Sequence, residues 1–241
     1  TYESCDLISQ AASLSPIVSY DSSTVLLLHC DGSNGGTTFT DSTNYAQTVT
    51  NAGLVVTSTA AAKFGTSSMY TPGSIGNYYL TVTSQALMFG TSDFTIEFWI
   101  NPSGSLTSIQ RLMGNCPSGL YNSGAWGAGF QGNGFFKIDI FNVASPALTS
   151  TTAMTAGNWY HIAIVRKGST WYLFQNGIQQ ATTTSSASFD NGGSARPVYI
   201  GWSGYSTTST NEYYNGYLDE IRFTNGVGLY TSNFTPASLP F

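Results

Sequence analysis

The sequence predicts an all-β sandwich, and three observations carry that prediction. Short runs rich in Val, Ile, Phe, Tyr and Trp recur along the 241 residues, separated by glycine- or asparagine-rich turns. Residues 157–180 form the pattern of an antiparallel meander, in which Asn176-Gly177 tolerates the positive φ of a tight hairpin. No convincing amphipathic helix interrupts these runs. We expect one domain, since all-β domains commonly reach roughly 200–250 residues.

The expected strands follow one another closely along the chain. The first is apolar and ends at Asp31-Gly32, and Pro102 ends the ladder of the strand over 93–102. That strand alternates so that four apolar side chains share one face, namely Phe94, Ile96, Phe98 and Ile100. Residues 84–90 are expected to form one helical turn. The expected strands cover 25–32, 53–58, 68–73, 77–83, 93–102, 111–115, 127–132, 135–143, 159–166, 171–175, 178–181, 197–204 and 215–226.

Residues 1–23 differ from the rest, because their apolar residues are scattered and no turn folds the segment back. We expect an N-terminal assembly arm outside a domain that spans residues 24–241. Burying each large apolar side chain of the arm against a neighbouring subunit is worth roughly 1.5–3 kcal/mol, and an extended arm can add a strand to another sheet's edge. The expected partner is a second copy, in a homo-oligomer or filament. The candidate assembly residues are Cys5, Leu7, Ile8, Leu14, Ile17 and Val18.

The three cysteines leave the disulfide state open. Cys30 lies in an apolar run and is expected to be a small buried hydrophobe, with a disulfide as the alternative. Cys5 precedes the first strand and is placed to pair between chains in an oxidising setting. No spacing of Cys5, Cys30 and Cys116 with histidine indicates zinc.

Charged residues make up only 8% of the chain, against about 25% in ordinary soluble domains. The net charge is −5 without a basic cluster, so nucleic acid is not an expected partner. No apolar run reaches the roughly 18–20 residues that span a bilayer, so membrane insertion is not expected. A surface of Ser, Thr, Asn, Gln and Gly responds weakly to salt. It suits an extracellular or virion surface.

Several segments together resemble laminin-G-like, concanavalin A-like jelly-roll domains. The segment LLLHCDG resembles their first strand, DFTIEFWINP their aromatic central strand, GNWYHIAIVRKGSTWYLFQNG their Trp-x-His hairpin and NGYLDEIRF their closing strand. The C-terminal GVGLYTSNFTPASLPF is similar to copies carried on bacteriophage virion proteins, such as tail-fibre or capsid-decoration proteins. The resemblance covers residues 25–241 and implies a concanavalin A-like jelly-roll β-sandwich with an N-terminal extended arm. This fold hosts lectins, adhesins, hydrolases and structural modules alike.

The carboxylates do not form the pair that glycosidases of this fold carry at alternate positions of one strand, about 5–5.5 Å apart. Glu97 and Asp139 each stand alone in their strands, and the adjacent Asp219 and Glu220 point to opposite faces. A pair built from two strands stays open. His161 and His29 have no identifiable nucleophile or orienting acid, and we expect core histidines that are hydrogen-bonded.

Asp31 and Asp219 are a candidate calcium site. In the resembled family their strands pair antiparallel, which brings the end of one near the start of the other. Two close carboxylates repel unless a cation or hydrogen-bond donors compensate, and backbone carbonyls of residues 32–36 would complete an oxygen-rich Ca²⁺ site. The alternative is that each aspartate caps its own turn through backbone N–H groups.

Two loops combine aromatic rings with small and polar residues, the chemistry that binds sugars by stacking and hydrogen bonding. Cell-surface glycans are therefore candidate partners. The alternative is that the rings pack beneath their own loops. The candidate ligand-binding residues are Tyr121, Trp126, Trp202, Tyr205, Tyr213 and Tyr214.

These observations favour a non-enzymatic structural or adhesive surface module that self-associates through its arm into a phage appendage or extracellular fibre. The second hypothesis is a monomeric glycan-binding lectin domain. The third is a glycoside hydrolase.

Overall fold

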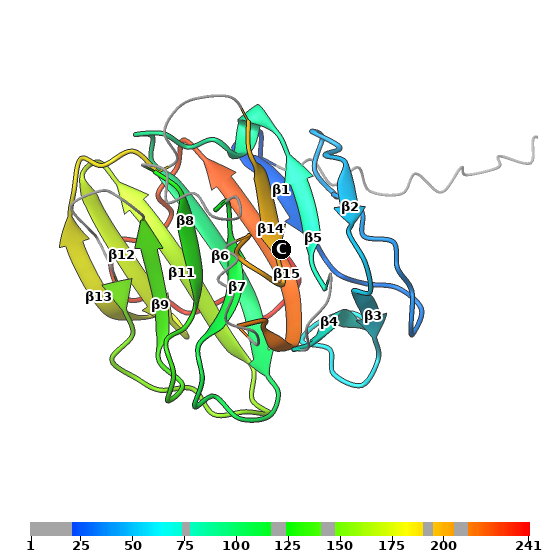
Figure 1. Ribbon diagram of the computed structural model, residues 1–241. Coiled ribbons are helices and arrows are strands. Elements are labelled where there is room, and N and C mark those ends of the chain that lie inside the picture. The colour runs from blue at the N-terminus through cyan, green and yellow to red at the C-terminus, as the bar shows by residue number, and fades with distance from the viewer. Residues whose placement is uncertain (1–20, 74–77, 117–123, 141–147, 190–194, 205–211) are drawn as a thin grey trace, which may run out of the picture.

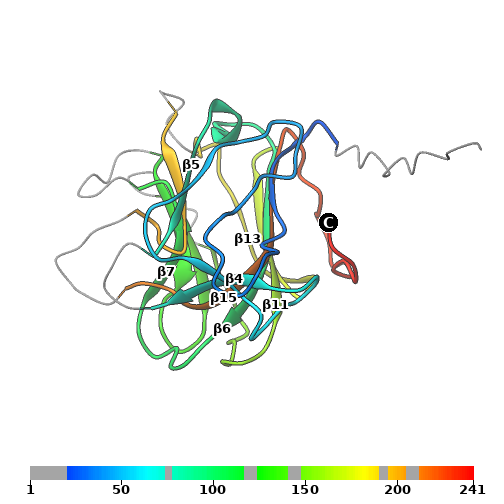
Figure 2. The same cartoon turned by 90° about the vertical axis from the view of Figure 1, so that its right-hand side faces the viewer.

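The computed structural model describes residues 21–73, 78–116, 124–140, 148–189, 195–204 and 212–241. Within these residues the chain forms two antiparallel sheets packed face to face, as Figure 1 and Figure 2 show. The predicted all-β sandwich is confirmed. The first sheet runs in the order β13 (Ile178–Thr184), β12 (Thr170–Gln175), β11 (Tyr160–Lys167), β6 (Phe94–Pro102), β15 (Asn215–Asn225), β4 (Ser68–Pro72) and β3 (Val56–Ser58), and β1 (Thr24–Leu28) also pairs with β15. The second runs in the order β10 (Leu148–Thr149), β9 (Phe136–Ile140), β8 (Trp126–Phe130), β7 (Gln110–Gly114), β14 (Pro197–Ile200), β5 (Leu80–Thr83) and β2 (Val49–Asn51).

Alternate side chains of the two sheets fill the core. On β6 the four apolar residues that the alternation predicts to share a face are all fully buried. Aromatic rings from both sheets and from the loops join them, with Phe189 4.6 Å from Phe94 and 4.8 Å from Trp126 between ring centroids. Burial of these large rings gives the sandwich much of its stability.

The turns follow the predicted chemistry. Asn176 and Gly177 have φ angles of 51° and 73°, and the meander β11–β12–β13 folds around them as expected. The predicted helical turn is the 3-10 helix η1 (Gln85–Leu87), which Ser84 caps by accepting a hydrogen bond from Ala86 N. Nowhere in the described part of the chain is a helix long and apolar enough to cross a membrane.

Strand β15 organises the first sheet. Strand β6 pairs along one edge of β15, whereas β4 and β1 share the other edge, β4 opposite 215–218 and β1 opposite 221–224. Between them the pairing with β6 shifts between Asp219 and Arg222, and Glu220 in this bulge has a φ of 49°. The bulge lies where β1 ends and β4 begins, so side chains from three strands meet there.

Three details differ from the sequence prediction. Strands β2 and β10 were not anticipated. Cys30 does not lie in a strand: β1 ends two residues earlier, and Cys30 is buried with a φ of 61°. Of the predicted arm, residues 1–20 lie outside the described residues, while Ser23 already belongs to the domain, because its carbonyl accepts a hydrogen bond from Asn225 N at 2.8 Å.

The C-terminal segment 226–241, called here the tail, lies on the outer face of the first sheet, on the right in Figure 2. Phe234 N donates to the Gly177 carbonyl at 2.9 Å, and Phe241 N donates to Glu220 at 2.9 Å. The tail therefore covers one face of the sandwich. The outer face of the second sheet is not covered by it.

Candidate functional site

The outer face of the second sheet carries a shallow groove. Its floor is β8, where the core residues alternate with Gly127 and Gly129, so that backbone lies at the bottom. Strand β9 places Lys137 opposite Gly129 and Asp139 opposite Gly127, and β7 places Arg111 opposite Gly129. Directly paired residues share a face of a sheet, so these three side chains form the walls. The groove has a volume of about 140 Å³ and is also lined by Ile109, Gln131 and Ser203.

Both walls are ion pairs. Lys137 Nζ lies 3.0 Å from Asp139 Oδ2 on one side. On the other side Arg111 Nε donates a hydrogen bond to the Glu212 carboxylate, and Arg111 N donates to the Glu212 carbonyl at 2.7 Å. The four side chains are 21–35% exposed. They are held in place by their partners and remain within reach of a ligand.

A cluster of aromatic rings borders the Arg111 side of the groove. The ring of Trp202 lies 5.2 Å from Tyr79, 5.4 Å from Tyr199 and 5.9 Å from Tyr213 between centroids. All four residues are partly exposed, and Trp202 directly precedes Ser203 of the groove lining. We call Tyr79, Tyr199, Trp202 and Tyr213 the aromatic rim. Partly exposed rings of this kind offer faces for stacking.

The predicted ligand-binding residues separate into three groups. Trp202 and Tyr213 belong to the aromatic rim. For Trp126 and Tyr214 the prediction of an exposed ring is wrong, because their exposed fractions are 1% and 0% and both rings pack in the core. Tyr214 also donates its hydroxyl to the Tyr217 carbonyl at 3.1 Å, and burial raises the pKa of that hydroxyl well above its ordinary value. The remaining two, Tyr121 and Tyr205, lie outside the described residues.

Sequence reasoning missed Arg111, Glu212 and the alternation around β8. A signal was present: Gly127 and Gly129 occupy one phase of their strand, while a lysine and an aspartate occupy one phase of the next. These residues meet because β9, β8 and β7 are neighbours in the second sheet. Strand β14, which is distant in sequence, pairs with the other edge of β7.

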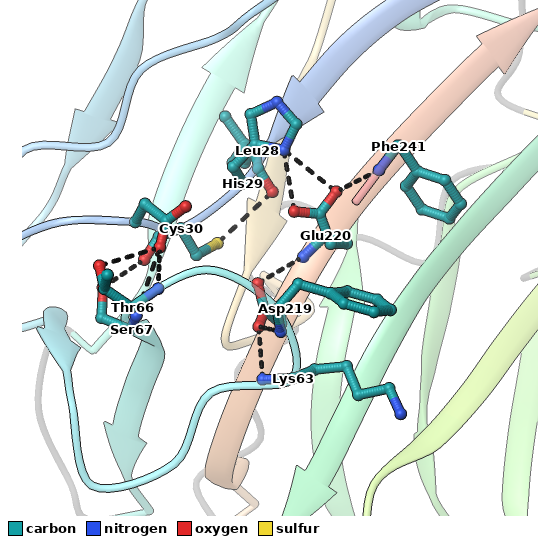
Figure 3. Close-up of polar contacts among 11 residues, drawn as sticks. Leu28, His29, Cys30, Lys63, Thr66, Ser67, Asp219, Glu220 and Phe241 are labelled. Atoms are coloured by element: carbon teal, nitrogen blue, oxygen red, sulfur yellow. Dashed lines mark hydrogen bonds and ion pairs between the residues drawn. The ribbon is translucent and has the colours of Figure 1, made fainter. Parts of the chain in front are cut away.

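The two predicted metal residues hold a single loop, as Figure 3 shows. Strands β1 and β15 pair antiparallel, as expected. Asp219 Oδ2 accepts hydrogen bonds from the backbone N–H groups of Lys63 and Phe64 at 2.8 and 3.1 Å, and Asp31 Oδ1 accepts from Thr66 N at 2.7 Å. The donors thus come from the segment 61–67, not from the aspartates' own turns alone. Among the described residues no group of three His, Cys, Asp or Glu side chains is arranged for a metal ion, and calcium binding stays a prediction.

The neighbouring bulge carries a coupled set of ionisable groups. Burial raises the pKa of Asp219 to about 7, although three backbone N–H groups oppose this shift. His29 Nδ1 lies 2.8 Å from Glu220 Oε1, and the hydrogen bond to Glu220 raises the pKa of His29. Since the same glutamate accepts the N–H of Phe241, it joins β1, β15 and the end of the tail. These contacts are structural, and none of them faces the groove.

A second buried network lies beneath the tail. Glu97 is fully buried and accepts hydrogen bonds from Arg222 Nε at 2.9 Å and from the Tyr230 hydroxyl at 3.0 Å, and it lies 3.1 Å from His161 Nε2. Burial raises the pKa of Glu97, but the hydrogen bond with His161 and the charge of Arg222 outweigh it and hold the pKa below its ordinary value. His161 is therefore the hydrogen-bonded core histidine that was predicted. Phe234 and Phe241 of the tail pack around its ring.

The fold and its groove define a class of protein. Residues 72–227 match a family model described as the concanavalin A-like lectin/glucanases superfamily, Laminin_G_3, and the chain belongs to this family. The matched residues include the whole groove and the aromatic rim. The resemblance to laminin-G-like, concanavalin A-like domains is confirmed.

Solved structures with the same fold include a toxin domain and a domain of a secreted enzyme. The binding domain of botulinum neurotoxin serotype D/C is 15% identical with a TM-score of 0.63, over 86% of this chain and 50% of that chain. This chain therefore spans about half the length of that toxin domain. Domain 4 of AbnA, a GH43 extracellular arabinanase from Geobacillus stearothermophilus solved with arabinotriose, is 15% identical with a TM-score of 0.59, over 84% and 92% of the two chains.

At such identities the likeness concerns the fold alone. A further solved structure is the binding domain of botulinum neurotoxin DC in complex with SialylT, at 15% identity and a TM-score of 0.63. A comparison with curated proteins finds no match to this chain. The relatives named here are toxin and enzyme domains, so the bacteriophage part of the predicted resemblance has no support from them.

Proposed function

We propose that this chain is a non-enzymatic glycan-binding module of an extracellular surface, and that the groove and its aromatic rim form the binding site. The observation that carries the proposal is the juxtaposition of four partly exposed rings with a groove walled by two ion pairs. Rings bind the apolar faces of sugars, and paired carboxylates and cations bind their hydroxyl groups. The family and the arabinotriose complex of a domain with the same fold support this choice.

Catalysis fits the groove less well than binding does. A glycosidase needs one carboxyl group that keeps its proton for the leaving group and a second that acts as nucleophile or base. Asp139 and Glu212, the carboxylates beside the groove, lie on opposite walls, and each is engaged in an ion pair, with Lys137 and with Arg111. Glu97 is buried in its own network on the other sheet.

The proposal is tested with the variants Trp202→Ala and Tyr213→Ala. Each removes one ring of the rim, and a stacked ring contributes about 0.5–1.5 kcal/mol, so affinity for a bound oligosaccharide should fall about two- to tenfold. Tyr70→Ala is the matched control: Tyr70 is also partly exposed, and its ring packs in a tilted arrangement against Tyr217, but on the first sheet. A glycan array identifies the ligand, and calorimetry measures affinity. Equal losses in all three variants, or turnover of the glycan, would refute the proposal.

Self-association through the N-terminal arm remains part of the proposed role. In that role the module would be carried on a phage appendage or an extracellular fibre. Its support is the sequence of residues 1–23, where apolar side chains are too numerous to remain in water without cost. The groove and the arm lie on different parts of the chain, so assembly and glycan binding are separable by mutation.

A further inference from the structure

The charges around the groove are balanced in pairs. The chain has seven Lys and Arg and twelve Asp and Glu, and two of each gather here. On the β9 wall Lys137 lies against Asp139, and on the β7 wall Arg111 lies against Glu212. The lining residues themselves carry Arg111, Lys137 and Asp139, and Glu212 lies beside them. Both cations of the lining are therefore already engaged by a carboxylate when a ligand arrives.

We infer that the groove selects neutral, linear polysaccharides and rejects acidic ones; this inference rests on the glycan-binding function proposed above. An acidic sugar would have to approach two carboxylates whose cations are already engaged, and a like charge brought close to a carboxylate repels it. A neutral sugar meets the same ion pairs as donors and acceptors for its hydroxyl groups, and hydrogen bonds to ionised groups are the stronger ones.

The shape of the groove supports a chain as the ligand. Because Gly127 and Gly129 follow one another on the outward phase of β8, no side chain interrupts the floor along that strand. The walls are two strand spacings apart, roughly 9.5 Å between the backbones of β7 and β9. Each wall carries polar groups along its length, and the aromatic rim lies beyond one of them. An open trough with a bare floor admits the middle of a chain, whereas a closed pocket would admit its end.

Gly129 also explains why the floor stays bare. A Cβ at this position would overlap the Gln110 carbonyl, with Arg111 Cα 3.0 Å away. The close approach of β7 and β8 therefore requires glycine there. The bare floor of the groove is therefore a consequence of the close packing of β7 and β8.

The test is affinity electrophoresis of the full chain in gels that contain one polysaccharide each: arabinan, unsubstituted xylan and a linear β-glucan as neutral probes, polygalacturonate and heparin as acidic ones. We expect retardation by at least one neutral probe and by neither acidic probe. The dissociation constant for the neutral probe, measured by calorimetry, should change less than about twofold between 0.05 and 0.5 M NaCl, because the probe carries no charge whose attraction salt could screen.

Two variants address the walls. In Asp139→Asn and Glu212→Gln one carboxylate loses its charge, so binding of the neutral probe should weaken about tenfold, the effect of one charge-assisted hydrogen bond. In Asp139→Asn, Lys137 no longer faces a charged partner in this ion pair, so retardation by polygalacturonate should appear in that variant. Asp93→Asn is the control, because Asp93 pairs with Lys167 away from the groove and should leave both readouts unchanged.

The outcomes separate the inference from the proposed function. Retardation by acidic probes with strong salt dependence, or wall variants that bind like the native chain while Trp202→Ala does not, would overturn the inference and leave glycan binding standing. Absence of retardation by every probe and of binding on a glycan array would overturn both. If the wall variants weaken binding of a neutral probe and Asp139→Asn also gains retardation by polygalacturonate, both the inference and the proposed function are supported.

Discussion

Replacing Arg222 with methionine should destabilise the fold far more than the loss of an ordinary surface ion pair. Arg222 hydrogen-bonds the fully buried Glu97, and its own side chain is only 21% exposed. Methionine keeps much of the apolar stem but leaves the carboxylate without its guanidinium. Removing one partner of a buried pair costs about 3–5 kcal/mol. Because Arg222 is partly exposed we expect about 3 kcal/mol, or a melting temperature lower by roughly 6–12 °C in a chain of this size.

Urea unfolding followed by tryptophan fluorescence measures the loss. Lys167→Met is the control, since Lys167 is 54% exposed in its ion pair with Asp93 and should cost below about 1 kcal/mol. The double variant Arg222→Met with Glu97→Gln should recover part of the stability, because the buried charge is gone.

The pH dependence gives the same reasoning a second test. The folded-state pKa of Glu97 lies below its unfolded value, so its contribution is present above the unfolded pKa and is lost as pH falls through the folded pKa. In Arg222→Met that folded pKa rises. The deficit relative to the native chain should therefore be largest at neutral pH and shrink toward about pH 4. A deficit no larger than that of Lys167→Met, or one that grows as pH falls, would refute this account.

Three further results are expected. Gly65→Ala should lower the free energy of unfolding by more than the about 1–2 kcal/mol that a left-handed backbone alone imposes, because Gly65 has a φ of 58° and its new Cβ would overlap the Asp31 carboxylate. Gly157→Ala, with a φ of 82° and open space around it, is the control in thermal melts, and equal losses of stability in the two variants would contradict the overlap. Chelation with EDTA should leave the melting temperature unchanged, because the Asp31 and Asp219 oxygens already accept backbone N–H groups; a drop reversed by CaCl₂ would instead establish the predicted calcium site. Deleting residues 1–20 should yield a folded monomer that no longer assembles, measured by light scattering, and an unchanged oligomer, or a monomeric full-length chain at high concentration, would show the arm prediction to be wrong.

The strands could be predicted because their signals are local. Alternation over 93–102 identified the buried face of β6, and the Asn-Gly pair identified the turn between β12 and β13. The antiparallel pairing of β1 and β15, expected from the family resemblance, is also present.

The candidate site was predicted only in part. Trp202 and Tyr213 were found as aromatic residues in a polar loop, but the same reasoning selected Trp126 and Tyr214, which are core residues. The sequence does not show which face of a strand an aromatic residue occupies when its neighbours are glycines, since glycine fits either face. Burial of Trp126 depends on which face of β8 meets Phe189 from a distant loop.

By itself, then, the sequence determined that this chain forms a β-sandwich, where most of its strands run and that its family is the laminin-G-like one. Alternation of apolar residues and the chemistry of turns involve only a few neighbouring residues, so both can be recognised in the sequence. The tertiary structure decided that Arg111, Glu212, Lys137 and Asp139 wall one groove, and that Asp31 and Asp219 hold a common loop. Those contacts depend on which strands pair and in which register. Pairing is fixed by the packing of the whole core, and the sequence of a single segment does not specify that packing.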